Sequence, residues 1–315
     1  MLPSMTPLAG GSGETFLAEA ADGRSVVRVY GERSRWRGPT APLVDAAVLR
    51  LVRGLLPAPQ VLEVRAPVGG APGLLVTSEL PGAPGEDVLP ALDPDALGRA
   101  GEQLGGAAAR LAGVPVLRRG VFADGDLRLV DFPPGAAPGE CLAAVEQAYA
   151  AGAFDGWPAP RLRGLGAVAA RAQRIVEDGE DELGEAAFLS HGDLGPANVL
   201  LDPATGDLLG VVDWEFAHAG IPWTDLGNLL RGRGGPDDDP FAAGVLGGWR
   251  EATRLVDPPG ATRLLDLARA ADLLALTRLA GGAGHAGAEE ARARLAAIAD
   301  RRDLHARLGD DAELD

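Results

Sequence analysis

The fold of this 315-residue chain is decided by one stretch, His191-Gly192-Asp193-Leu194-Gly195-Pro196-Ala197-Asn198. Only two asparagines and four histidines occur in the chain, so this combination at this spacing seldom arises by chance. Two short apolar runs follow, 199–201 and 208–212, and the segment between them is rich in the Asp, Pro and Gly of turns. This pattern predicts a β-hairpin whose second strand delivers Asp213 at its end.

Asp193 and Asn198 have the His-x-Asp-x-x-x-x-Asn spacing of a kinase catalytic loop. Phosphoryl transfer spreads charge onto phosphate oxygens, which Mg²⁺ neutralises, and Mg²⁺ prefers hard oxygen ligands such as an Asn amide and an Asp carboxylate. We therefore expect Asn198 and Asp213 to bind magnesium. Asp193 would then be the catalytic base that accepts the proton of an acceptor hydroxyl. The alternative is an ordinary loop with solvated acids.

The first 80 residues predict a small sheet with one helix. Short apolar runs separated by turn residues indicate strands at 14–20, 25–30, 61–65 and 74–78. Apolar residues at helical spacing indicate a helix over 43–53. A stretch punctuated by Pro and Gly then follows Glu79 and breaks both kinds of structure. We expect an N-terminal lobe over 1–80, a hinge at 81–86 and a C-terminal lobe over 87–315.

Helical patterns dominate the second lobe. They cover residues 95–112, 140–151, 162–177, 241–255, 262–280 and 288–308. The predicted fold class is therefore α+β and bilobal, with a small antiparallel sheet plus one helix in the N-terminal lobe and a larger, mainly helical C-terminal lobe.

The catalytic-loop stretch, the segment Val211-Val212-Asp213-Trp214-Glu215 and the segment 222–230 (Pro-Trp-Thr-Asp-Leu-Gly-Asn-Leu-Leu) together resemble the aminoglycoside phosphotransferase family. The resemblance is strong over 188–231 and weaker, but in the right order, over 10–82. It implies a protein-kinase-like fold and a small-molecule kinase that uses ATP or GTP with Mg²⁺. By this resemblance Asp213 matches the aspartate of the kinase Asp-Phe-Gly motif, with Trp and Glu in place of Phe and Gly.

Two further residues are expected to support the catalytic loop. For His191, packing the loop and hydrogen bonding to backbone near Asp213 is the more economical interpretation, with catalysis as the alternative. The resemblance implies that Asp225 is a buried anchor that accepts hydrogen bonds from the loop. By itself, Asp225 is equally consistent with a residue that begins a helix.

Candidate nucleotide-binding residues lie in the N-terminal lobe. Gly11, Ser12 and Gly13 stand between two apolar runs, where a loop would lay backbone N–H groups over phosphates. Glycine clusters are common in a chain with 45 glycines, so this prediction depends on position more than on composition. In the stretch before the hinge, the backbone of Glu79 and Leu80 would bind the edge of a purine. Because backbone atoms would make these contacts, the sequence does not tell whether adenine or guanine is preferred.

Arg28 stands where kinases have a strand lysine that contacts the α- and β-phosphates. The chain contains no lysine, so arginine must supply this charge. We expect Arg28 to form an ion pair with Asp45 of the following helix, and a solvated Arg28 is the alternative.

Acceptor selection is expected in the helical lobe after Asp225. The acidic run that contains Asp237 and Asp238 would meet amino groups of a polycationic acceptor, and Glu215 is a further candidate for substrate binding. Charge runs are also common on solvated faces, so both interpretations remain open.

The charge balance disfavours polyanionic partners. With 45 acidic against 29 basic side chains the formal net charge is −16, which repels nucleic acids and anionic membranes. The same charge either keeps the protein soluble or favours a cationic substrate. A single cysteine, the lack of a signal-peptide pattern and the lack of a long apolar run lead us to expect a cytoplasmic protein. The oligomeric state stays open.

Three functions are therefore weighed. The first is a kinase for a hydroxyl of an aminoglycoside-like or other antibiotic. The second is a metabolic kinase of the same fold, acting on a sugar, an amino alcohol or a fructosamine-like acceptor. The third is a silent nucleotide-binding module, which we would expect to have lost one of the three key residues Asp193, Asn198 and Asp213.

Overall fold

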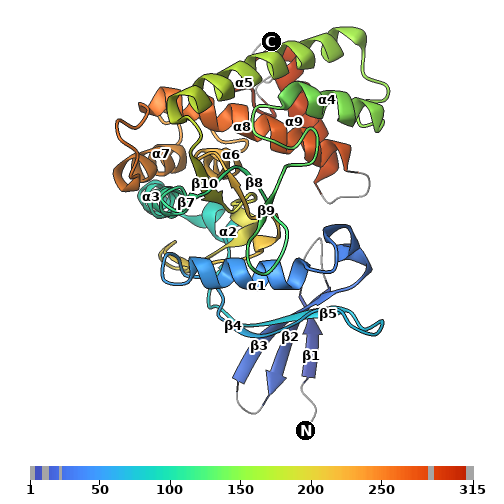
Figure 1. Cartoon of the computed structure of the whole chain (residues 1–315). Helices are drawn as coiled ribbons and strands as arrows, with labels where there is room; N and C mark the ends of the chain where they lie inside the picture. Colours follow the sequence, from blue (N-terminus) through green and yellow to red (C-terminus); the bar gives the residue numbers. More distant parts are fainter. Residues whose placement is uncertain (1–3, 9–13, 21–22, 283–286, 310–315) are drawn as a thin grey trace.

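The computed structural model describes residues 4–8, 14–20, 23–282 and 287–309. They form a small lobe built on an antiparallel sheet and a larger, mainly helical lobe (Figure 1). The sheet has the strand order β1-β2-β3-β5-β4. Its strands are β1 (Ser4–Pro7), β2 (Glu14–Ala20), β3 (Gly23–Tyr30), β4 (Val61–Arg65) and β5 (Gly73–Ser78). The predicted α+β, two-lobed fold is confirmed, and β1 is a strand that the sequence did not predict.

Helix α1 (Ala41–Val52) lies between the sheet and the large lobe (Figure 1). Pro42 stands in its first turn, where the missing N–H has no helical partner to lose. Val44, Val48 and Val52 recur at a spacing of four residues and are buried, because this spacing places them on one face. The helix contacts β4 and β5 on one side and the short turn of 3₁₀-helix at 214–216 on the other. It therefore connects the small sheet to the predicted metal ligand Asp213.

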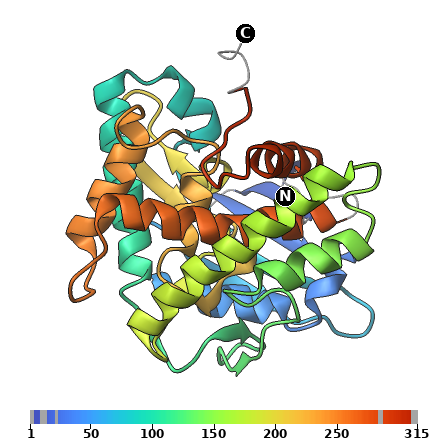
Figure 2. The same ribbon diagram turned by 90° about the horizontal axis from the view of Figure 1, so that it is seen from above.

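The large lobe contains the helices that the sequence predicted, with ends that differ by a few residues. They are α3 (Pro94–Leu111), α4 (Cys141–Ala150), α5 (Ala159–Leu183), α7 (Pro240–Ala252), α8 (Ala261–Gly281) and α9 (Ala288–Arg301); two short helices, α2 (Gly85–Val88) and α6 (Thr224–Leu229), were not predicted. Helix α5 packs against α8 and α9, and α4 packs against α5 and α8 (Figure 2). Elsewhere in the lobe α3 packs against α7 so closely that a Cβ on Gly105 would lie 2.0 Å from the Val245 carbonyl oxygen.

Two small sheets lie inside the helical lobe. One has the order β12-β11-β6, with β6 (Ala83–Pro84), β11 (Val199–Leu201) and β12 (Leu208–Val211), so the predicted hairpin is confirmed. The other has the order β7-β10-β13-β8-β9. Its strands are β7 (Pro115–Val116), β8 (Gly120–Phe122), β9 (Leu129–Val130), β10 (Ala187–Ser190) and β13 (His218–Gly220). The second sheet was not predicted, because strands of two to four residues are too short to show a periodicity.

The segment predicted as a hinge is bound to the large lobe. Strand β6 pairs with β11, where Pro84 lies opposite Leu200, and α2 begins at Gly85. A second link joins the lobes where Val211 donates its backbone N–H to the carbonyl oxygen of Pro57, 2.8 Å away. The boundaries 1–80, 81–86 and 87–315 stay a prediction.

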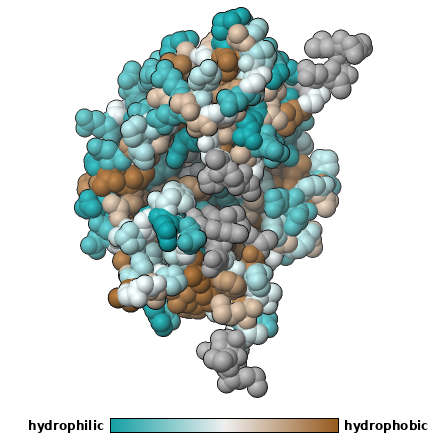
Figure 3. Space-filling model, turned by 90° about the vertical axis from the view of Figure 1, so that its right-hand side faces the viewer, coloured by the Kyte–Doolittle hydropathy of each residue, from teal (hydrophilic) through white to brown (hydrophobic). Residues whose placement is uncertain are grey.

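The surface seen in Figure 3 carries both hydrophilic and hydrophobic residues. On the face seen in Figure 3, hydrophilic residues predominate over the upper, helical lobe, and hydrophobic residues gather over the small sheet at the bottom. Within the described ranges, no helix has both the length and the apolarity needed to cross a membrane.

Candidate active site

The proposed catalytic loop connects β10 to β11, and its two key side chains bind each other. A turn of 3₁₀-helix, Pro196–Asn198, brings Asn198 back toward Asp193. The Asn198 amide nitrogen donates to the Asp193 carboxylate oxygen Oδ2 at 2.9 Å and to the Asp193 carbonyl oxygen at 2.8 Å. The Asn198 carbonyl Oδ1 thus keeps its lone pairs for another partner. The loop therefore fixes the orientation of Asp193 through a contact that the spacing of the two residues allows.

His191 and Asp225 hold this loop in place by hydrogen bonds to backbone groups. The Asp225 carboxylate accepts the backbone N–H groups of His191 and Gly192, each at 2.9 Å. The His191 ring accepts the Asp193 N–H at Nδ1 and donates from Nε2 to the Val212 carbonyl oxygen at 2.9 Å. Burial lowers the pKa of His191 to about 4, so the ring is neutral at pH 7. Both residues make the contacts expected of supports for the loop.

Asp193 has an unusual proton affinity for an aspartate. Burial raises its pKa to about 6; the charge of Arg231 and the Asn198 hydrogen bond oppose this rise, and Asp213 and Glu215 add to it. A carboxylate with a pKa near the working pH is both ionised at neutral pH and a competent proton acceptor. These properties suit a general base better than a solvated surface acid.

Arg231 is a functional candidate that the sequence analysis missed. Its guanidinium donates to the Asp272 carboxylate at 2.7 and 2.9 Å and to the Asn228 amide oxygen at 2.9 Å. These contacts hold a positive charge near Asp193, where it favours the ionised carboxylate. Arg231 directly follows the segment 222–230 that carries the family resemblance, so its position was the available signal.

Asn198 and Asp213 lie at adjacent ends of the hairpin. Val199 pairs with Val211, and the Val212 N–H donates to the Asn198 carbonyl oxygen at 2.9 Å. Asp213 adopts the left-handed backbone conformation (φ 61°) and keeps 35% of its side chain exposed. Both residues offer hard oxygen atoms, the donor set that suits Mg²⁺ when phosphates supply further ligands. The residues present therefore fit the predicted magnesium ion, although the described part of the chain contains no cluster of three or more His, Cys, Asp or Glu that would hold a metal by itself.

Arg28 reaches across from the sheet to the large lobe. Its Nη1 lies 2.8 Å from the Asp213 carboxylate and its Nη2 lies 2.6 Å from the Glu215 carboxylate. These contacts place a guanidinium next to the proposed metal ligand. Arg28 thus brings a positive charge from the small sheet to Asp213 and Glu215, and its contact with phosphates stays a prediction.

The expected ion pair between Arg28 and Asp45 is wrong. Asp45 instead accepts two hydrogen bonds from Arg37, at 2.5 and 2.7 Å, and one from the Tyr30 hydroxyl at 2.5 Å. Arg37 belongs to a 3₁₀-helix (Glu32–Arg37) just before α1, which brings its planar guanidinium to the carboxylate in a two-bond geometry. Burial and the Asp45 charge raise the pKa of Tyr30, so Tyr30 stays a hydroxyl donor.

The remaining candidates for nucleotide binding come from the small lobe and its junction with the large lobe. Gly11, Ser12 and Gly13 lie outside the described residues. Glu79 pairs with Arg24 at 3.1 Å, and Leu80 packs beside Gly210 of the hairpin. Their backbone thus lies at the junction of the lobes, and the purine contact stays a prediction.

The predicted acceptor-binding acids are not brought together. Asp237 and Asp238 are exposed in the segment before α7, and the next residue, Asp239, caps that helix and pairs with Arg233. Glu215 lies within the site, but its carboxylate is held by Arg28.

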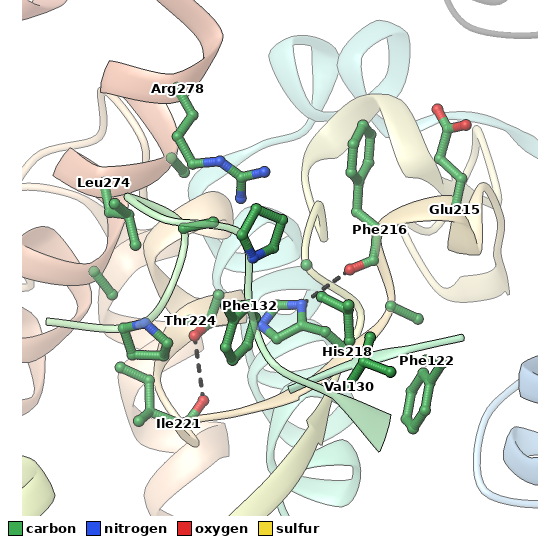
Figure 4. A pocket seen from close by; sticks show the side chains of 18 of the residues that line it. Phe122, Val130, Phe132, Glu215, Phe216, His218, Ile221, Thr224, Leu274 and Arg278 are labelled. Atoms are coloured by element: carbon green, nitrogen blue, oxygen red, sulfur yellow. Dashed lines mark hydrogen bonds between the residues drawn. The ribbon is translucent and has the colours of Figure 1, made fainter. Parts of the chain in front are cut away.

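A cavity of about 420 Å³ lies beside the catalytic loop. Its wall includes Gly192, the residue before Asp193, together with the turn Glu215–His218. The other walls come from segments far apart in the chain: 36–44, 121–141 and 270–278. Figure 4 shows Phe216 and Glu215 on one side of this space and Leu274 and Arg278 of α8 on the other. The sequence alone gives no sign of this cavity, because no local pattern connects its walls.

The cavity wall is mainly apolar and aromatic. Phe122, Phe132 and Phe216 line it, and Phe216 stacks on Trp36 with ring centroids 5.9 Å apart. Among the described residues of the wall, Glu215 is the only acid. The arrangement offers a partly open, mainly apolar site for a small molecule beside Gly192, the neighbour in sequence of the proposed proton acceptor.

Comparisons with known proteins agree with this architecture. The model of a phosphotransferase enzyme family (APH) matches residues 4–264. A ternary complex of a thermostable mutant of the aminoglycoside phosphotransferase APH(4)-Ia with ADP and hygromycin B superposes with a TM-score of 0.62 and 16% identity, over 95% of this chain and 92% of that one. A GDP and kanamycin complex of APH(2″)-IIIa gives a TM-score of 0.64 and 16% identity, over 96% and 93%. A microcompartment-associated aminopropanol kinase gives 0.60 and 20% identity, over 95% and 92%. No curated protein matches the chain significantly in sequence.

Proposed function

The chain belongs to the phosphotransferase enzyme family, and on this premise we propose that it transfers the γ-phosphoryl group of ATP or GTP to a hydroxyl group of a small molecule. The observation that carries the proposal is the geometry of Asp193. Asn198 orients the Asp193 carboxylate by a hydrogen bond. Burial raises the pKa of this carboxylate to about 6, and the nearby charges of Asp213 and Glu215 add to the rise. Nucleotide binding alone does not require an oriented carboxylate that can accept a proton.

In the proposed reaction, one bond to the γ-phosphorus forms while another breaks. The acceptor oxygen forms a bond to the γ-phosphorus while the bond from that phosphorus to the β–γ bridging oxygen breaks, which releases the nucleoside diphosphate. The hydroxyl proton passes to Asp193 and from there to water. Asn198 and Asp213 would hold Mg²⁺, which neutralises the charge that develops on the phosphate oxygens.

Residues of both lobes would bind the nucleotide. Arg28 is held by Asp213 and Glu215, so its guanidinium is already oriented when phosphates arrive. The backbone of Glu79 and Leu80 would contact the purine edge, and the loop that contains Gly11, Ser12 and Gly13 would cover the phosphates. Asp45 contributes indirectly, because its contacts with Tyr30 and Arg37 fix helix α1 beside the site.

Two acceptor classes follow from the structural neighbours. The complexes with hygromycin B and kanamycin favour an aminoglycoside-like antibiotic, and the aminopropanol kinase favours a metabolic acceptor. The cavity argues against a polycation, because amino groups are usually bound by free carboxylates and the only acid of its described wall is ion-paired. We therefore propose a small-molecule kinase whose acceptor is not a polycation.

The test is phosphate transfer from ATP and from GTP, with Mg²⁺, to a panel of aminoglycosides, macrolides, sugars, amino alcohols and hydroxy acids. We expect one class to gain the mass of a phosphoryl group, with one nucleoside diphosphate released per product. Asp193→Asn should abolish this transfer and retain nucleotide binding. Release of inorganic phosphate without any phosphorylated acceptor, or full turnover by Asp193→Asn, would contradict the proposal.

A further inference from the structure

One positive charge at the cavity, that of Arg278, has no counter-charge among the residues that the structure describes. Arg278 of α8 is an exposed residue of the cavity wall, and Figure 4 shows its guanidinium directed toward the side chains that line the space. It makes no hydrogen bond or ion pair with any described residue. The protein around it lowers its pKa by displacing water, and no carboxylate acts against this effect. An arginine in such a setting is a ready partner for an anion.

The other polar groups of the wall are already satisfied or neutral. Glu215 is bound by Arg28, and Arg37 is bound by Asp45. His218 donates from Nδ1 to the Phe216 carbonyl oxygen, and burial together with the charge of Arg278 lowers its pKa. Burial raises the pKa of Cys141 to about 12, so its thiol stays protonated. Among the residues that the structure describes, the cavity wall therefore carries one positive charge without an ion-pair partner, beside apolar and aromatic side chains.

We propose that the phosphoryl acceptor of this protein is a hydroxy acid: an apolar or aromatic body that carries a carboxylate, bound by Arg278, and a hydroxyl group that reaches Asp193. This inference rests on the proposed kinase activity and names the substrate class of the same site. A single guanidinium matches the charge of one carboxylate and can bind both of its oxygens. A phosphate group would leave part of its charge uncompensated in a mainly apolar space.

The geometry gives each part of the acceptor a place. The wall includes Gly192, so the space borders the catalytic loop, and Arg278 lies on α8 across from Phe216 (Figure 4). The aromatic residues of the wall, Phe132 among them, suit a flat apolar body. The reaction is the transfer already written, with the acceptor oxygen attacking the γ-phosphorus and the proton leaving to Asp193.

The experiment compares three probes with one skeleton and different charge: para-(hydroxymethyl)benzoate, its primary amide and para-(aminomethyl)benzyl alcohol. Their binding to the full chain with a non-hydrolysable ATP analogue and Mg²⁺ is measured by calorimetry, and their phosphorylation with ATP by mass. We expect the carboxylate to bind best. Arg278→Gln should weaken its binding by about 10- to 100-fold, because a hydrogen bond to a charged group contributes about 1.5–3 kcal/mol, and should leave binding of the amide unchanged.

Arg263→Gln is the matched control. Arg263 lies on the same helix, outside the cavity wall, and its pair with Glu182 at 3.8 Å is at the surface. Surface pairs of this kind contribute about 1 kcal/mol or less. This variant should therefore bind all three probes as the wild type does.

The outcomes separate this inference from the kinase activity. Equal binding of the amide or the amine, no binding of the carboxylate, or an Arg278→Gln variant with unchanged preference would overturn the hydroxy-acid acceptor. If a neutral or cationic compound were then phosphorylated, the kinase activity would stand without it. Carboxylate binding that depends on Arg278 but never leads to phosphate transfer would support the carboxylate site and count against the kinase.

Discussion

The catalytic centre and the cavity beside it differ in how their charges are arranged. In the centre, Asp193 is bound by Asn198, Asp213 by Arg28, and Asp225 by two backbone N–H groups. In the cavity, the wall is mainly apolar and aromatic, and its exposed residue Arg278 has no such partner within the described residues. A satisfied polar network is rigid and positions reacting groups, whereas an unsatisfied charge in an apolar space selects what binds. The two regions thus suit chemistry and recognition respectively.

The two regions also differ in their origin in the sequence. Asp193, Asn198 and Asp213 lie within 21 residues and are joined by one hairpin. The cavity wall comes from α1, from the β8–β9 region and from α8, which meet only in the folded chain. If this division is right, substitutions in the centre should change kcat and substitutions in the cavity should change KM.

The largest effect is expected at Asp193. Asp193→Asn keeps the size of the side chain and its contact with Asn198 but removes the proton acceptor, so kcat should fall by about 10²- to 10⁴-fold. Binding of the nucleotide should stay within about threefold, since Asp193 is not a proposed phosphate or metal ligand. Steady-state kinetics and nucleotide titration measure both quantities. A variant that retains wild-type kcat would remove Asp193 from the mechanism.

The pH profile should follow the same group. The pKa of Asp193 is raised to about 6 in the free protein, and only the ionised carboxylate accepts a proton. Below pH 6 the group is protonated, so kcat/KM should fall about tenfold per pH unit; above about pH 7 it should level off. Because this ratio reports the enzyme form to which the acceptor binds, the profile is measured at subsaturating acceptor with nucleotide held constant. A profile that stays flat down to pH 5 would contradict a base with this pKa.

A smaller effect is expected when the cavity is filled. Ala275 of α8 lines the space, and Ala275→Leu would occupy part of it. We expect KM for the acceptor to rise by about tenfold, or about 1.4 kcal/mol, because the larger side chain would take up space that the acceptor needs. Nucleotide affinity and kcat at saturating acceptor should change little. Kinetics in both substrates provide the measurement, and Ala275→Ser, which adds only one small atom, is the control.

The smallest effect is expected at the acidic run before α7. Asp237 and Asp238 are exposed and do not line the cavity. The double variant Asp237→Asn with Asp238→Asn should change kcat/KM by less than about threefold, as surface substitutions usually stay within about 0.5 kcal/mol. A large loss of activity toward a cationic acceptor would restore these acids as substrate ligands and break the proposed division between centre and cavity.

The elements that the sequence predicted share one property: each is long enough to show its own pattern. Helices such as α3, α7 and α8 were predicted because their apolar residues recur at helical spacing, and β4 because a run of apolar residues ends at a turn. Strands β7, β8, β9, β10 and β13 were missed because each has only two to four residues, and their pairing comes from contacts far along the chain.

Contacts between distant segments also decide how the side chains of the site pair, so local patterns did not predict them. The Arg28–Asp45 pair was predicted from the usual arrangement of a strand cation and a helix acid. Arg37 displaces Arg28 because a short 3₁₀-helix turns its guanidinium onto Asp45, and no spacing rule predicts that turn. Arg28 in turn contacts Asp213 and Glu215, which are about 185 residues away.

By itself, the sequence determined the kind of chemistry to expect. The loop from His191 to Asn198 and the hairpin to Asp213 are local, so residue type and spacing are enough to indicate the groups and their order. Only the tertiary structure decided which charges meet, how burial raises the pKa of Asp193, and that Arg278 lines a mainly apolar cavity with no counter-charge in the described part of the chain. The physical reason is that burial and ion pairing depend on which distant segments pack together. The spacing of residues within one segment does not indicate which other segments will contact it.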